Sequence, residues 1–200
     1  MMHIDYQHLL IFGLVVIPVW FLVTYFWPRL MLSVYKRALL VKGFGDGPIP
    51  VNTLYTQPQK LFAEPLASQT ASSSNLMTVG VNHDTLSTVG WLDLSQGPLV
   101  LHVPDMDDRY YSVQFTDPLK NTNFAYVGKR ATGTQAGDYL ITRPGWNGQA
   151  PGGMKQISSP NKSVLVLGRV LVKSDSDLAT AYDLSKQIQL TPLSHWQPGQ

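Results

Sequence analysis

The chain has 200 residues, with 15 Lys and Arg against 13 Asp and Glu and no cysteine. The absence of cysteine excludes a disulfide framework, a thiolate metal site and a cysteine nucleophile. Four of the basic residues lie in residues 29–42, whereas residues 43–200 carry eleven basic and twelve acidic residues, a net charge of −1. Because the folded part has no cluster of Lys and Arg, we expect no nucleic-acid binding.

The N-terminal segment predicts a membrane anchor. Leu9–Trp27 contains nineteen residues without a charge, which at ~1.5 Å per residue is just long enough to cross a hydrocarbon core of roughly 30 Å. Aromatic residues crowd its second half and Arg29 follows it, as at a membrane interface. A cleaved signal peptide usually has a basic start and a small-x-small cleavage site. Neither is present, so we expect a retained single-pass helix that Pro18 kinks without breaking.

Three parts follow one another along the chain. Residues 1–42 are the predicted anchor helix with a basic juxtamembrane segment, residues 43–75 a Pro-, Gly- and Ser-rich spacer, and residues 76–196 the folded domain. The glycines and prolines from residue 43 onwards are expected to end the anchor helix. The spacer either holds the domain away from the bilayer or lies along the domain surface. Partial docking is favoured by four apolar residues, which are Leu54, Tyr55, Leu61 and Phe62.

Alternating apolar residues and frequent turn residues predict antiparallel strands in the domain. The expected strands are residues 76–81, 88–94, 98–103, 110–116, 124–127, 138–142 and 163–172. The last is apolar on both faces, so we expect it to be central and Arg169 to lie near its end or beside an acid. The two-residue period places His102 opposite Leu99, Leu101 and Val103, and turns Tyr111, Val113 and Phe115 inward or, in the other register, outward.

The C-terminal segment predicts one helix. Residues 174–177 supply N-cap candidates, and Thr191-Pro192 is expected to end the segment. One helical face carries Leu178, Ala181, Tyr182 and Ile188. The predicted fold is therefore mainly β, an immunoglobulin-like β-sandwich with one C-terminal amphipathic helix, preceded by a single transmembrane helix.

Several motifs in this order resemble a known bacterial family. They are Asn82 with Asp84-Thr85-Leu86, Trp91–Ser95 with Gly97-Pro98, Val103–Asp105, Arg109–Tyr111, Thr132–Thr134 with Ala136–Ile141, Pro144–Trp146 and Leu190–Ser194. Together they resemble the family called domain of unknown function 1254. The resemblance implies an immunoglobulin-like sandwich that is often followed by a jelly-roll domain. Because the sequence ends at Gln200, we expect that domain to be a separate protein that docks here.

The resemblance and the charge pattern differ on location. Relatives are often secreted, which implies the periplasmic side of a bacterial inner membrane. The basic residues after the span would place the domain in the cytoplasm under the positive-inside rule. We expect the periplasm, because a bias on one short loop can be overridden.

Each candidate site also has a structural interpretation. His83 beside Asp84 could begin a metal or acid–base site, but Asn and Asp close turns through their side chains, and a turn is favoured. The sequence at Asp105, Asp107 and Asp108 lacks the glycine and the late Glu of a calcium loop, so a solvated turn is favoured. Ser95 is not in a nucleophile elbow. The glycines at 128, 133 and 137 do not open a helix, as a phosphate loop would.

Two functions remain open. The favoured one is a membrane-tethered binding or assembly module without catalysis, and the alternative is a subunit of an envelope hydrolase or glycan-acting enzyme. The residues expected to bind a ligand or partner are Asn82, Asp84, Arg109, Tyr111 and Trp146. If there is catalysis, Asp84 and His102 are the candidates, together with Asn82 and Arg109 from loops at one end of the sandwich. We expect no metal and no cofactor.

Overall fold

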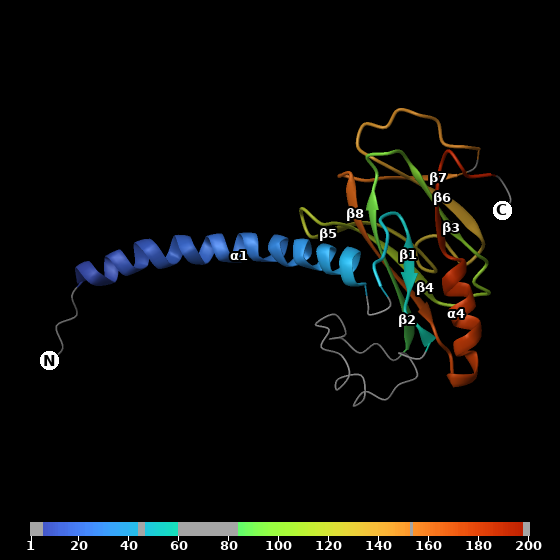
Figure 1. Ribbon diagram of the computed structural model, residues 1–200, viewed down its shortest axis with the longest axis horizontal. Coiled ribbons are helices and arrows are strands. Elements are labelled where there is room, and N and C mark those ends of the chain that lie inside the picture. Colours follow the sequence, from blue (N-terminus) through green and yellow to red (C-terminus); the bar gives the residue numbers. More distant parts are fainter. Residues whose placement is uncertain (1–5, 44–46, 60–83, 153, 198–200) are drawn as a thin grey trace.

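The protein is a two-sheet β-sandwich with a long helix at one end of the chain and a short helix near the other (Figure 1). The computed structural model describes residues 6–43, 47–59, 84–152 and 154–197, with side chains from residue 12 onwards. The long helix is α1 (Tyr6–Lys42), and the C-terminal elements are the 3₁₀ turn η1 (Asp175–Asp177) and helix α4 (Leu178–Gln187). The expected mainly-β sandwich with two flanking helices is thus confirmed.

One sheet has five strands and the other has four. The five-stranded sheet has the order β1 (Leu54–Thr56), β2 (Thr85–Asp93), β8 (Ser163–Leu171), β4 (Tyr111–Asp117) and β5 (Thr122–Gly128). The four-stranded sheet has the order β7 (Lys155–Ser158), β6 (Gly137–Thr142), β3 (Leu99–Val103) and β9 (Gln189–Pro192). Every pairing is antiparallel except that of β6 with β7. Strand β8 is central, as its apolar sequence predicted.

The main core lies between the two sheets. The inward row of β4 is Tyr111, Val113 and Phe115, and all three are buried, as the alternation predicted. The odd residues of β3 face the same core, while His102 lies on the outer face and is partly exposed. Helix α4 adds Ala181 to this core. The buried hydroxyl groups of Thr88 and Ser185 lie 3.0 Å apart where α4 meets β2.

Some elements differ from the expectation. The strand predicted at residues 76–81 lies outside the described residues. Strand β7 forms in a stretch rich in Gly and Pro, and β9 forms at Thr191-Pro192, because pairing with β6 and β3 outweighs the local sequence preference. Arg169 lies two residues before the end of β8, as expected, and its side chain is exposed on the outer face of the sheet.

The C-terminal third of α1 packs on the outer face of the five-stranded sheet. Leu39 is fully buried there in a second apolar cluster, which also contains Ile49, Val89, Trp91 and Leu165. The helix is continuous to Lys42, and it passes through both Pro18 and Pro28. Gly43 ends it at φ 59°, and its amide donates to the carbonyls of Ala38 and Leu39, as in a helix terminated by a left-handed glycine.

The predicted spacer is part of the folded domain where it is described. Leu54 and Tyr55 lie in β1, which pairs with β2, and Ile49 is buried against α1. Residues 47–57 therefore lie along the domain, and they do not separate it from α1. Leu61 and Phe62 lie outside the described residues.

Candidate functional site

The turn between β3 and β4 is built by its own side chains. The Asp105 carboxylate accepts a hydrogen bond from the Asp107 amide at 2.9 Å, and Asp107 and Asp108 have positive φ angles of 45° and 55°. Asp108 pairs with Lys129 at 2.7 Å, and Met106 is fully buried beneath the turn. These contacts fit the solvated turn that the sequence favoured, and they position Arg109 just before the start of β4.

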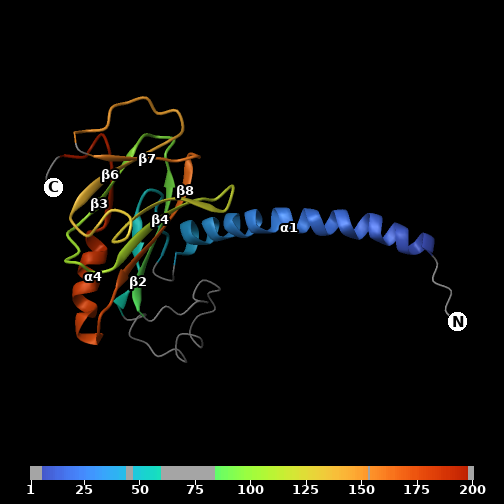
Figure 2. The ribbon, with the colours of Figure 1, turned by 180° about the vertical axis from the view of Figure 1, so that it is seen from behind.

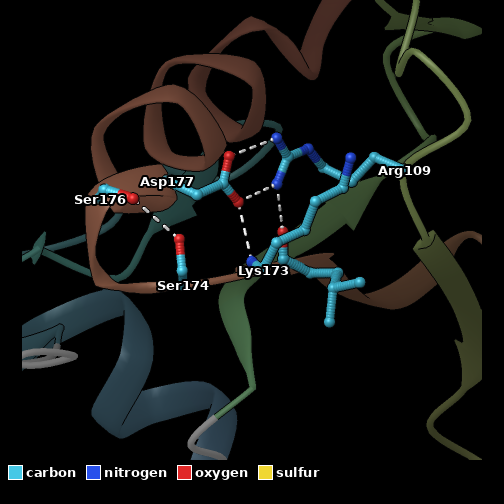
Figure 3. Close-up of polar contacts among 6 residues, drawn as sticks. Arg109, Lys173, Ser174, Ser176 and Asp177 are labelled. Atoms are coloured by element: carbon cyan, nitrogen blue, oxygen red, sulfur yellow. Dashed lines mark hydrogen bonds and ion pairs between the residues drawn. The ribbon is translucent and has the colours of Figure 1, made fainter.

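Arg109 clamps the C-terminal helix to the sandwich (Figure 3). Its Nη1 donates to Asp177 Oδ2 at 2.5 Å and to the Leu171 carbonyl at 2.7 Å, and its Nη2 donates to Asp177 Oδ1 at 2.7 Å. The Lys173 amide donates to the same carboxylate at 2.8 Å. This bidentate pair joins the β3–β4 turn, the end of β8 and the start of α4.

The electrostatics of the clamp follow from this geometry. The side chains of Arg109 and Asp177 are 6% and 17% exposed. The hydrogen bonds from Arg109, with help from the Lys173 amide and nearby positive charge, lower the pKa of Asp177 to about 2, and the same pair raises the pKa of Arg109. A ligand carboxylate or phosphate would have to displace Asp177 to reach the guanidinium. The pair is therefore suited to holding the fold together.

His102 forms a separate pair in the other sheet. Its Nδ1 lies 2.8 Å from Asp138 Oδ1, and the two residues are opposite each other in the register of β3 and β6. Their side chains are 36% and 26% exposed. At this exposure a cross-strand ion pair contributes little stability.

The other predicted site residues are dispersed. Asp84 precedes β2, and its carbonyl accepts from the Val172 amide, so it lies near the same end of β8 as Arg109. Tyr111 is fully buried, and its hydroxyl donates to the Gly133 carbonyl at 3.1 Å. Burial raises the pKa of that hydroxyl. Trp146 is half-buried in the loop after β6, and Asn82 and His83 lie outside the described residues.

The described site residues do not assemble into one constellation. His102 is engaged by Asp138 in one sheet, and Arg109 is engaged by Asp177 beside the other. In the described parts of the chain, no three His, Asp or Glu residues are grouped as a metal site requires. The acid partners were missed at the sequence level. Arg109, which directly precedes a strand predicted to be buried, was the one indication of an acidic partner, because a buried charge requires a counter-charge.

The family can now be assigned. Residues 65–192 match the profile of the family described as "Protein of unknown function (DUF1254)". The chain belongs to this family. The match covers the strands of the sandwich from β2 onwards, together with the Arg109–Asp177 clamp.

The comparison with solved structures gives one match that shares the fold. The VPA0106 protein from Vibrio parahaemolyticus is 24% identical, with a TM-score of 0.61 over 85% of this chain and 37% of that chain. An uncharacterised protein from Burkholderia cenocepacia is 16% identical, with a TM-score of 0.39 over 60% of this chain and 31% of that chain. This chain thus spans well under half the length of either of these two proteins. No curated protein matches it.

The α1 helix is long and apolar enough to cross a membrane. The most apolar 18-residue window within Phe12–Lys42 has a mean hydropathy of 1.6, and none of that window is buried against the rest of the protein. A membrane anchor and a signal sequence both have this composition.

Proposed function

We propose that this DUF1254 protein is a membrane-anchored module whose sandwich is held directly at the bilayer surface by a retained α1 helix. The supporting observation is that α1 has two regions. Its apolar side chains are exposed from Phe12 to Met31, and from Leu32 onwards it packs on the sandwich. The uncharged stretch Leu9–Trp27 rises ~30 Å, the thickness of a hydrocarbon core.

The packing favours a retained helix over a cleaved signal sequence. Cleavage after α1 would remove Leu39, which is fully buried, and would uncover Val89, Trp91 and Leu165. Exposing that much apolar surface costs several kcal/mol at about 25 cal/mol per Å². A signal peptide that is cleaved does not contribute to the core of the mature domain.

The anchor is tested by the mass and extraction of the protein from membranes. We expect the mature chain to keep residues 1–42 by intact mass and to stay in the membrane pellet after alkaline carbonate washing. A mature chain that begins after residue 42, or one released by carbonate, would refute the proposal. We propose that the domain lies on the periplasmic side of the inner membrane. The test is a reporter fused after Gln200 that is active only in the periplasm. An inactive reporter would place the domain on the cytoplasmic side instead.

We further propose that the module docks a separate jelly-roll partner. The proposal is supported by the Vibrio protein, because the region that matches this chain is only 37% of that protein. Native co-purification in mild detergent is the test. A monomer recovered alone would end the proposal. The hydrolase alternative needs Asp84, His102 and Arg109 to line one common pocket, whereas the side chains of His102 and Arg109 bind Asp138 and Asp177.

A further inference from the structure

The outer face of the five-stranded sheet extends beyond the area that α1 covers. One transverse row of this face runs from strand to strand through Tyr55, Val89, Leu167, Gln114 and Tyr126, which are register partners in β1, β2, β8, β4 and β5. Register partners point to the same side of a sheet. The first three residues of the row pack with α1, so the β4–β5 part of the face lies beside the helix.

The β4–β5 hairpin carries exposed apolar groups on this side. Outside α1, the described residues expose three large apolar side chains, which are Val51, Leu119 and Tyr126, at 39%, 59% and 50%. Leu119 is at the hairpin tip, and Tyr126 is on the α1 face. In both ribbon views β5 and the hairpin extend in the direction in which α1 leaves the domain (Figures 1 and 2).

The hairpin tip is held in shape. The Asp117 carboxylate accepts hydrogen bonds from the amides of Leu119 and Lys120 at 2.9 and 3.4 Å, which leaves both side chains exposed. On the adjoining face Asn123 Nδ2 donates to the Tyr126 hydroxyl at 2.8 Å. Fixing the turn in this way lowers the entropy cost of inserting its tip into another phase.

Positive charge surrounds the base of α1. The Lys36 ammonium lies 5.1 Å from the centroid of the Trp91 ring. The pKa of Asp93 is lowered, first by hydrogen bonds from Ser95 and further by the nearby charges of Lys36 and Lys162. Arg169 is exposed on the outer face of β8. These charges complement anionic lipid headgroups.

The length of α1 places this surface at headgroup depth. If Trp27 marks the end of the span, Leu32 is five residues further on and already packs on the sandwich. Five residues rise roughly 8 Å, about the thickness of one headgroup layer. A hairpin that extends along α1 from the sheet therefore reaches that layer.

We propose that the β4–β5 hairpin is a second membrane contact, in which Leu119 and Lys120 enter the headgroup layer of an anionic bilayer and Tyr126 lies at its surface. This rests on the proposed anchoring by α1. An interfacial tyrosine, an apolar tip and flanking lysines form the chemistry by which peripheral surfaces bind anionic lipids. The hairpin would fix the orientation of the sandwich about the helix axis.

The absence of cysteine allows a direct test in the full chain. A fluorophore is attached to one cysteine at a time, at Thr122→Cys beside the tip, at Ser176→Cys in η1, or at Phe21→Cys in the exposed part of α1. All three positions are exposed. Each protein is placed in lipid discs of phosphatidylcholine, with or without phosphatidylglycerol, that carry nitroxides on the headgroup or on the middle of the acyl chain.

The expected result has three parts. Headgroup nitroxide quenches the Thr122 label and leaves the Ser176 label unquenched, while acyl-chain nitroxide quenches the Phe21 label. Phosphatidylglycerol increases quenching at Thr122. In that lipid, Lys120→Glu shifts the bound-to-unbound ratio of the hairpin by roughly fivefold or more, because one basic residue near an anionic surface has about that effect.

The possible failures are distinguishable. Quenching at Phe21 with none at Thr122 overturns the hairpin contact and leaves the anchor in place; a protein partner covering the hairpin gives this result. No quenching at Phe21 removes both proposals. Quenching at Thr122 that ignores phosphatidylglycerol and Lys120→Glu overturns the role of anionic lipid. Unchanged circular dichroism of each variant shows that it has folded.

Discussion

The Arg109–Asp177 clamp predicts a specific pH dependence of stability. Asp177 has a folded pKa of about 2 against an ordinary value of 3.8. This difference corresponds to at most about 2 kcal/mol, reduced by solvent screening because the carboxylate is partly exposed. The folded pKa is the lower one, so the stabilisation is complete above about pH 4 and is lost as the pH falls towards about 2.

The test is the substitution Asp177→Asn. It removes the negative charge and leaves Arg109, whose side chain is 6% exposed, without its counter-charge. We expect a loss of about 1–2 kcal/mol at neutral pH. The difference from the unsubstituted protein should narrow between about pH 4 and about pH 2. Urea unfolding of the full chain in mild detergent, followed by tryptophan fluorescence, measures it.

Asp175→Asn is the matched control. Asp175 lies in the same 3₁₀ turn, and its side chain is exposed. The substitution removes the same negative charge as Asp177→Asn. Its substitution should change stability by less than about 0.5 kcal/mol. Equal losses for the two variants, or a loss for Asp177→Asn that stays constant down to about pH 2, would refute the clamp.

Three further substitutions test other contacts in the same unfolding assay. Gly43→Ala should cost about 1–2 kcal/mol, because Gly43 has φ +59° and an added Cβ would lie 1.9 Å from the Gly47 carbonyl oxygen; an unchanged midpoint would contradict this geometry. Thr88→Val should cost about 1–2 kcal/mol by removing the buried hydroxyl partner of Ser185, and a neutral result would show that the pair adds nothing. His102→Gln should cost less than about 1 kcal/mol, since its side chain is 36% exposed; a larger loss would give the pair an unexpected structural role.

The amino-acid pattern was sufficient to predict the elements in which apolar residues recur at a regular spacing. The shared face of Tyr111, Val113 and Phe115, the central place of β8 and the end of α1 at Gly43 all follow from local rules. It was insufficient for β7 and β9, because a short polar strand is stabilised by its neighbour and not by its own sequence.

The candidate site shows the same limit. Arg109 and His102 were predicted as candidate site residues from the sequence. The partner of Arg109 is Asp177, 68 residues away, and that of His102 is Asp138, 36 residues away. No periodicity connects such distant positions. Only the pairing of strands and the placement of α4 decide which carboxylate meets which cation.

The sequence by itself determined an apolar helix of spanning length, a mainly-β domain and a family signature, because hydropathy and turn chemistry act over a few residues. The surface on which α1 packs is set by the tertiary structure. It packs Leu39 against Trp91 and makes residues 47–57 part of the domain. This brings the sandwich to the end of the exposed apolar part of α1, because contacts between segments distant in sequence form only when the whole core assembles.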